Sequence, residues 1–79
     1  MSTVLDLGPE LARKRLVAEM ERVDLGDWDT TPDCLDGLAI LIGNRAAGGQ
    51  EVGELPALLR ALARAEGVDL HPRASAALP

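Results

Sequence analysis

Leucines spaced at the period of an α-helix restrict the fold of this chain more than any other feature. A helix over residues 54–66 would carry one apolar stripe, made of Leu55, Leu58, Leu59 and Leu62. Arg60 and Arg64 fall on the other side, and Gly67 follows as a helix stop signal. Because such a stripe is stable only when another element covers it, the pattern predicts a helix over about residues 54–66 with a packed core against it.

A second helix is predicted over residues 9–23, with residues 1–8 before it as an N-terminal arm. Pro9 suits the first turn of a helix, where its missing N–H costs nothing. The apolar residues of the segment fall on one helical stripe: Ala12, Leu16, Met20 and Val23. The basic triplet Arg13-Lys14-Arg15 spreads around most of a helical turn, so we interpret it as part of the solvated face and not as a phosphate-binding patch.

The third predicted helix covers residues 32–46. Thr30 and Thr31 offer a helix cap, and Pro32 takes the first helical position. The apolar run Gly37–Gly43, bounded by glycines, is also typical of a buried strand. Only residues near the N-terminus could pair with such a strand, and two strands make a poor sheet. We therefore expect a helix here, with the strand as the alternative.

The kinds of apolar residue agree with an all-α fold. Most of them are Leu and Ala, which favour helices, and the chain has a single aromatic residue. We predict one domain over residues 1–79, a small orthogonal or bundle-like arrangement of three helices, with residues 71–79 as a loose tail or a short helix that a partner orders. A chain of 79 residues buries only about 60–65 % of its unfolded surface, and its one cysteine excludes an internal disulfide. Association with itself or with a larger protein is the expected source of further stability.

The formal net charge of −5 is concentrated in residues 24–36, DLGDWDTTPDCLD. The acids and bases balance on both sides of this segment, which itself has no base and holds Asp24, Asp27, Asp29, Asp33 and Asp36. An acidic chain is repelled by nucleic acid and by anionic membranes, so we expect neither as a direct partner. The longest apolar run, Leu38–Ile42, is far shorter than the roughly 20 residues that cross a bilayer. With no signal-peptide pattern at the N-terminus, the expected location is the cytoplasm.

Catalytic and metal-binding chemistry is not expected. Cys34 and His71 form the one possible pair of nucleophile and base, but Cys34 falls on an apolar helix face and His71 precedes a proline. The acids of residues 27–33 alternate like the opening of a calcium-binding loop. However, Pro32 stands where that loop needs its glycine, and Leu38 stands where it needs a glutamate. The sequence therefore predicts a protein that is not an enzyme and has no metal or cofactor.

The candidate binding residues surround the only tryptophan. Tryptophan is enriched in binding hot spots, and acids around it would steer a basic partner. We predict a partner-binding surface formed by Asp27, Trp28 and Asp29 with Asp24 and Asp33. The alternative is that Trp28 folds over the core beside Leu25 while the aspartates cap helices and keep the protein soluble.

Ile40 and Asp36 are the candidate self-association residues, because Ile40 falls opposite the apolar face of its helix. Together these features predict a non-enzymatic protein–protein interaction module, a small adaptor or an accessory or regulatory subunit that acts through a larger partner and forms a homodimer. The alternative is an acidic inhibitor, antitoxin-like or phage-encoded, that occupies a basic or nucleic-acid-binding surface of its target. The high content of Ala, Gly and Arg fits a high-GC bacterial or phage genome.

Overall fold

Three long helices form the framework of the protein in a computed structural model that describes residues 8–79. They are α1 (Pro9–Arg22), α2 (Leu35–Ala47) and α3 (Leu55–Glu66); a short 3-10 turn, η2 (Pro32–Cys34), leads into α2, and a six-residue helix, α4 (Pro72–Ala77), follows α3. No strand forms within residues 8–79. The all-α prediction is therefore confirmed, and the predicted N-terminal arm lies almost wholly outside the described residues.

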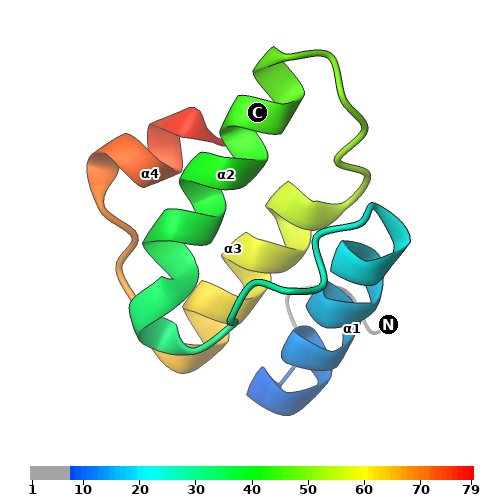
Figure 1. Ribbon diagram of the computed structural model, residues 1–79. Coiled ribbons are helices and arrows are strands. Elements are labelled where there is room, and N and C mark those ends of the chain that lie inside the picture. The colour runs from blue at the N-terminus through cyan, green and yellow to red at the C-terminus, as the bar shows by residue number, and fades with distance from the viewer. Residues whose placement is uncertain (1–7) are drawn as a thin grey trace, which may run out of the picture.

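The helices pack as two pairs joined through the centre. Figure 1 shows α1 beside α3 and α4 beside α2, and α2 also contacts α3. The leucine stripe of α3 faces inward as its spacing predicts, and Leu55, Leu59 and Leu62 are completely buried. The other completely or almost completely buried large side chains come from α1 and α2: Leu16, Met20, Leu35, Leu38 and Ile42. The buried side chains of α1, α2 and α3 thus form one shared core, and each of these helices has one face packed against it.

The segment Gly37–Gly43 is helical, which excludes the alternative strand. Its apolar residues do not all face the core: Ile42 is buried, whereas Ile40 is 43 % exposed. The helix begins later than predicted, since residues 32–34 form the 3-10 turn and α2 itself starts at Leu35. Thr31 is the N-cap residue of that turn, but its side chain makes no capping hydrogen bond.

Two forms were predicted for residues 71–79, a loose tail or a short helix that a partner orders, and the structure has a short helix in this segment. Residues 72–77 form α4, which packs against α2 and buries Ala74 and Leu78. Gly43 of α2 permits this contact: a Cβ added there would overlap the carbonyl oxygen of Ala77 and lie 2.8 Å from its Cβ. The absence of a side chain on Gly43 thus lets α2 and α4 approach closely.

Side chains from neighbouring helices hold both ends of α4. Asp36 accepts a hydrogen bond through Oδ1 from the backbone N–H of His71 (2.9 Å), just before α4 begins. Arg60 of α3 donates from Nη2 to the carbonyl oxygen of Ser75 (3.3 Å) near the other end. A six-residue helix is too short to be stable alone, so these contacts and the burial of Ala74 account for its formation.

A carboxylate on α1 organises the start of α3. Glu19 pairs with Arg22 (2.8 Å) and accepts the backbone N–H of Glu54 (2.9 Å), the residue that precedes α3. The hydrogen bond from Arg22, with that of the Glu54 N–H, lowers the pKa of Glu19 from 4.5 to about 2. Glu19 thereby satisfies a backbone donor at the helix start that would otherwise have no partner within the helix.

This arrangement predicts an acid-sensitive contribution to stability. Because the folded-state pKa of Glu19 lies below its ordinary value, the contribution is complete above a pH of about 4.5 and is lost as the pH falls towards 2. Replacing Glu19 by Gln should cost roughly 1 kcal/mol at pH 7, since a partly exposed charge-assisted hydrogen bond is weakened. Urea titrations of both proteins at several pH values should show their stabilities converging in acid; a constant difference down to pH 2 would contradict the assignment.

Candidate functional site

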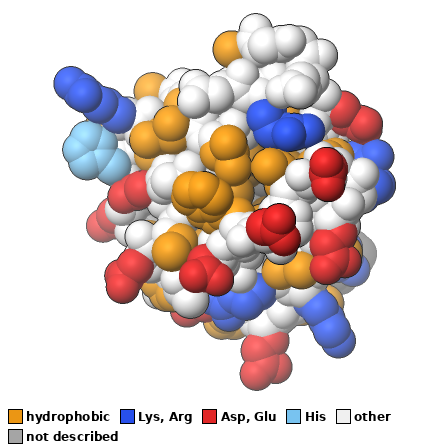
Figure 2. Space-filling model, in the orientation of Figure 1, with side chains coloured by type: hydrophobic (Ala, Val, Ile, Leu, Met, Phe, Trp, Pro, Cys, Tyr) orange, Lys and Arg blue, Asp and Glu red, His pale blue; other side chains and the backbone are white. Residues whose placement is uncertain are grey.

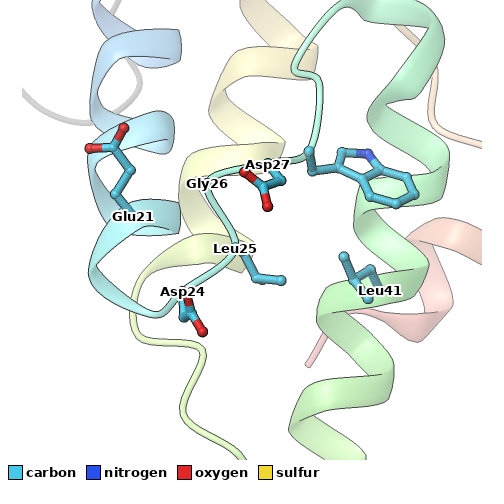
Figure 3. A pocket seen from close by; sticks show the side chains of 7 residues that line it. Glu21, Asp24, Leu25, Gly26, Asp27 and Leu41 are labelled. Atoms are coloured by element: carbon cyan, nitrogen blue, oxygen red, sulfur yellow. The ribbon is translucent and has the colours of Figure 1, made fainter.

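A hollow of about 480 Å³ lies where the end of α1, the following loop and the middle of α2 meet. It is lined by three carboxylates, three apolar side chains and a glycine: Glu21, Asp24, Asp27, Leu25, Leu41, Trp28 and Gly26. Figure 3 shows Leu25 from the loop and Leu41 from α2 pointing toward one another across this space. Both leucines are half-buried against the core, so the hollow has an apolar floor.

Trp28 lies at the edge of the hollow with 41 % of its surface exposed. Its Nε1–H donates to the carbonyl oxygen of Cys34 (3.3 Å), at the start of α2. The ring also rests on Gly37, because a Cβ added at Gly37 would lie 3.0 Å from Cζ2 of Trp28. Trp28 is therefore neither fully buried nor free: it is held against the first turn of α2 while much of its surface remains exposed.

The loop that carries Trp28 leaves α1 through a tight hydrogen-bonded turn. The N–H of Asp24 donates to the carbonyl of Glu21 (3.2 Å), and the N–H of Leu25 donates to that of Met20 (2.6 Å). This is the Schellman pattern, which needs a left-handed residue after the helix, and Asp24 has a φ of +67°. Glycines take the same place after the other long helices: Gly49 after α2 and Gly67 after α3, with φ of +80° and +70°.

Asp24 thus occupies a backbone conformation in which glycine is unstrained, so Asp24→Gly should not weaken the fold. We expect an unchanged free energy of unfolding or a gain of up to about 1 kcal/mol, since relief of left-handed strain is partly offset by the greater freedom of glycine in the unfolded chain. Thermal unfolding followed by circular dichroism would measure it. If Asp24→Gly lowered the stability, the Asp24 carboxylate would have to stabilise the loop by an interaction other than the backbone hydrogen bonds described above.

Two arginines fasten the loop at its ends. Arg13 of α1 forms an ion pair with Glu66 of α3 and also lies 3.4 Å from the carbonyl oxygen of Thr30. Arg45 of α2 donates from Nη2 to the carbonyl oxygen of Val23 (3.0 Å), at the end of α1. Arg13 therefore has a structural role that the sequence interpretation of the basic triplet as solvated missed, because its two partners lie 17 and 53 residues away.

The electrostatics of the hollow are one-sided. The carboxylates of Glu21, Asp24 and Asp27 stand around its apolar floor, and none of the residues that line it is basic. Arg45 follows Leu41 by one helical turn, but its guanidinium is directed to the carbonyl of Val23. Such a surface can accept an apolar side chain accompanied by a positive charge.

The residues considered for catalysis or metal binding are not brought together among the described residues. Within residues 8–79, no group of three or more His, Cys, Asp and Glu side chains is placed to hold a metal ion. Cys34 is half-buried, and its carbonyl accepts the Trp28 hydrogen bond. His71 is exposed, and its Nδ1 accepts the backbone N–H of Arg73 (3.1 Å), which leaves that nitrogen engaged.

The predicted binding residues are only partly brought together. Asp24, Asp27 and Trp28 line the hollow, whereas Asp29 and Asp33 are exposed but do not line it. Four members of the lining are not among the predicted binding residues: Glu21, Leu25, Gly26 and Leu41. Leu25 appears in the sequence analysis only as a neighbour of Trp28 in the alternative, and Glu21 is also close to Trp28 in sequence, whereas Leu41 reaches the hollow only because of how α2 is oriented.

The two predicted self-association residues lie in different surroundings. Ile40 is exposed on α2, next to Leu41 and one turn beyond Gly37, so it extends the apolar surface near Trp28. Asp36 is half-buried and engaged with the backbone of His71.

Comparison with known proteins adds no family to this description. No helix within residues 8–79 is long and apolar enough to cross a membrane. No family model matches the chain, and neither a curated protein nor a solved structure matches it.

Proposed function

We propose that this protein is a non-enzymatic interaction module, a small adaptor or accessory subunit that binds a larger protein through the hollow beside Trp28. The observation that carries the proposal is the half-exposed Trp28 ring, held against α2 at the border of an apolar hollow with an acidic rim. A rigidly held aromatic side chain contributes large contact area at small entropic cost, which is why such residues dominate binding hot spots.

The partner surface we propose is basic with an apolar centre. The rim carboxylates Glu21, Asp24 and Asp27 would attract it and reject acidic surfaces, while contact with Trp28 and Leu41 would supply most of the affinity. Asp29 and Asp33, exposed on the same loop, would add to the long-range attraction.

A second candidate function is inhibition of a protein that has a basic or nucleic-acid-binding surface. The concentration of carboxylates around the hollow, with no base in its lining, favours this alternative. The two functions differ in their response to salt. An inhibitor that acts by charge mimicry should lose most of its affinity as salt screens the carboxylates, whereas an adaptor that relies on Trp28 and its apolar neighbours should lose little.

Trp28→Ala tests the site, because it removes the aromatic contact while leaving the core leucines in place. We expect it to weaken capture of the partner from a lysate of the native host by at least about tenfold, a typical loss for a hot-spot residue. Leu11→Ala is the matched control: Leu11 is a similarly exposed apolar residue, 43 % against 41 % for Trp28, but it lies on the first turn of α1. Equal capture by the wild type and Trp28→Ala, with both folded, would overturn the proposal.

A further inference from the structure

Helix α2 carries apolar residues on two opposite faces. One face is buried in the core. The other face has an outward stripe whose members are spaced at i, i+3 and i+4: Gly37, Ile40 and Leu41. Ile40 is 43 % exposed and Leu41 is half-buried, so the rest of the described chain does not cover this stripe. A helix that is apolar on both faces is either enclosed within its own domain or shared with a partner, and α2 is not enclosed.

The outward stripe of α2 continues into the hollow beside Trp28. The Trp28 ring rests on Gly37 at one end of the stripe, and Leu41 lines the hollow itself. Figure 2 shows this side of the molecule, where hydrophobic side chains gather near the centre, over α2, with acidic side chains beside them. Trp28, Ile40 and Leu41 therefore belong to one apolar surface along the outside of α2.

The acidic groups of the hollow stand on one side of this apolar surface. Glu21 comes from α1 and Asp24 and Asp27 come from the loop, whereas Leu41 comes from α2 on the other side of the hollow, as Figure 3 shows. The three carboxylates are exposed, and none of them forms an ion pair within residues 8–79. No residue that lines the hollow is basic. Positive charge along one flank of an occupant would therefore meet unpaired negative charge.

We infer that the occupant of this surface is an amphipathic helix of the larger partner, with an apolar stripe and with Lys or Arg along one flank. The inference rests on the proposed function and makes its partner specific. The apolar stripe of that helix lies along Ile40 and Leu41 and against the Trp28 ring. Its basic flank faces the carboxylates of the hollow.

The other common ways of binding a peptide do not fit this surface. Strand addition needs the open edge of a sheet, and residues 8–79 contain no strand. Grooves for proline-rich segments are lined by aromatic side chains, whereas Trp28 is the only aromatic residue of the chain. Phosphorylated or acidic segments are bound by clusters of arginine, and carboxylates line this hollow instead. A helix laid on an apolar surface needs contact residues at helical spacing, which α2 supplies.

Synthetic peptides test the helical occupant directly. The probe is a panel of peptides of about 14 residues, roughly four helical turns, without aromatic residues. Each carries Leu, Ile or Met at i, i+3, i+4 and i+7 and Lys along one flank. Binding to the full chain should shift the emission of Trp28, its only aromatic residue, to shorter wavelength as the ring is covered. The bound peptides should gain helical circular dichroism.

Two altered peptides separate the helical shape from the charge. A scrambled peptide keeps the composition and the positive charge but loses the apolar stripe. A peptide with a central proline keeps the order of the residues but cannot form a continuous helix. Both should bind at least about tenfold more weakly than the amphipathic peptide. If the net charge of −5 alone attracted the peptides, all of them would bind equally.

Ile40→Ser is the corresponding change in the protein. Fluorescence anisotropy of an end-labelled peptide should show a loss of affinity of about tenfold, because the apolar stripe of the peptide loses its contact with Ile40. Leu11→Ser is the matched control. Leu11 is also 43 % exposed, but it lies on the first turn of α1 and does not line the hollow, so the affinity should not change.

The helical occupant is overturned if no peptide of the panel binds, if the scrambled peptides bind as tightly as the amphipathic ones, or if Ile40→Ser binds them like the wild type. Sedimentation that shows a dimer of the chain alone, which Ile40→Ser dissociates, would assign the surface to a second copy instead. None of these results affects the proposed function, which falls only if Trp28→Ala captures the larger partner as well as the wild type does.

Discussion

Leu59→Asp is expected to abolish folding. Leu59 is completely buried in the middle of α3, between the helices that make the core. Loss of a buried leucine side chain alone costs about 2–5 kcal/mol, and a carboxylate without a buried partner adds several more. A domain of this size has a total stability of only about 5 kcal/mol, so the sum exceeds what the fold can lose.

The measurement is far-UV circular dichroism with a thermal scan, and the matched control is Ala57→Asp. Ala57 is exposed on the same helix and close to its N-terminal end, where a negative charge is favourable. The control should keep the helical signal and a cooperative transition. A cooperative transition for Leu59→Asp within a few degrees of the wild type would show that the α3 stripe does not form the core.

Gly43→Ala is the second substitution with a large expected effect, although it adds a single methyl group. In most helix interiors this change stabilises by about 0.5–1 kcal/mol. At Gly43 the new Cβ would overlap the carbonyl of Ala77, so α4 must move away from α2. We expect the free energy of unfolding to fall by about 1–3 kcal/mol, the usual range for overpacking. The structural change should be limited mainly to α4.

Hydrogen exchange can locate this loss, because amides of α4 should exchange faster while those of α1 and α3 keep their protection. Gly48→Ala is the matched control: a Cβ at Gly48 would lie 3.5 Å from its nearest neighbour, and its φ of −83° suits alanine. That variant should match the wild type. If Gly43→Ala were stabilising and α4 stayed protected, the close approach of α2 and α4 would be disproved.

The helices were predictable because their signals are local. Pro9 and Pro56 mark the first turns of α1 and α3, and Pro32 marks the 3-10 turn that precedes α2. Gly67 marks the end of α3, and the spacing of the leucines in residues 54–66 predicts which face of that helix is buried. The candidate site was predictable only in part. Trp28 and its neighbouring aspartates stood out by composition. Leu41 lines the hollow from α2, and nothing in the sequence around Leu41 indicates this position.

The amino-acid sequence by itself determined the helical class, the approximate helix bounds and the place where negative charge collects, because each of these follows from residues within a few turns of one another. Only the tertiary structure decided that residues 72–77 form a helix on α2, that Arg13 holds both Glu66 and the loop, and that the Trp28 ring rests on Gly37. The physical reason is the same in all three cases. Each depends on how two segments distant in sequence fit together. The contacts of small residues such as Gly37 and Gly43 cannot be predicted from the sequence, because they depend on the shape of the surface that packs against them.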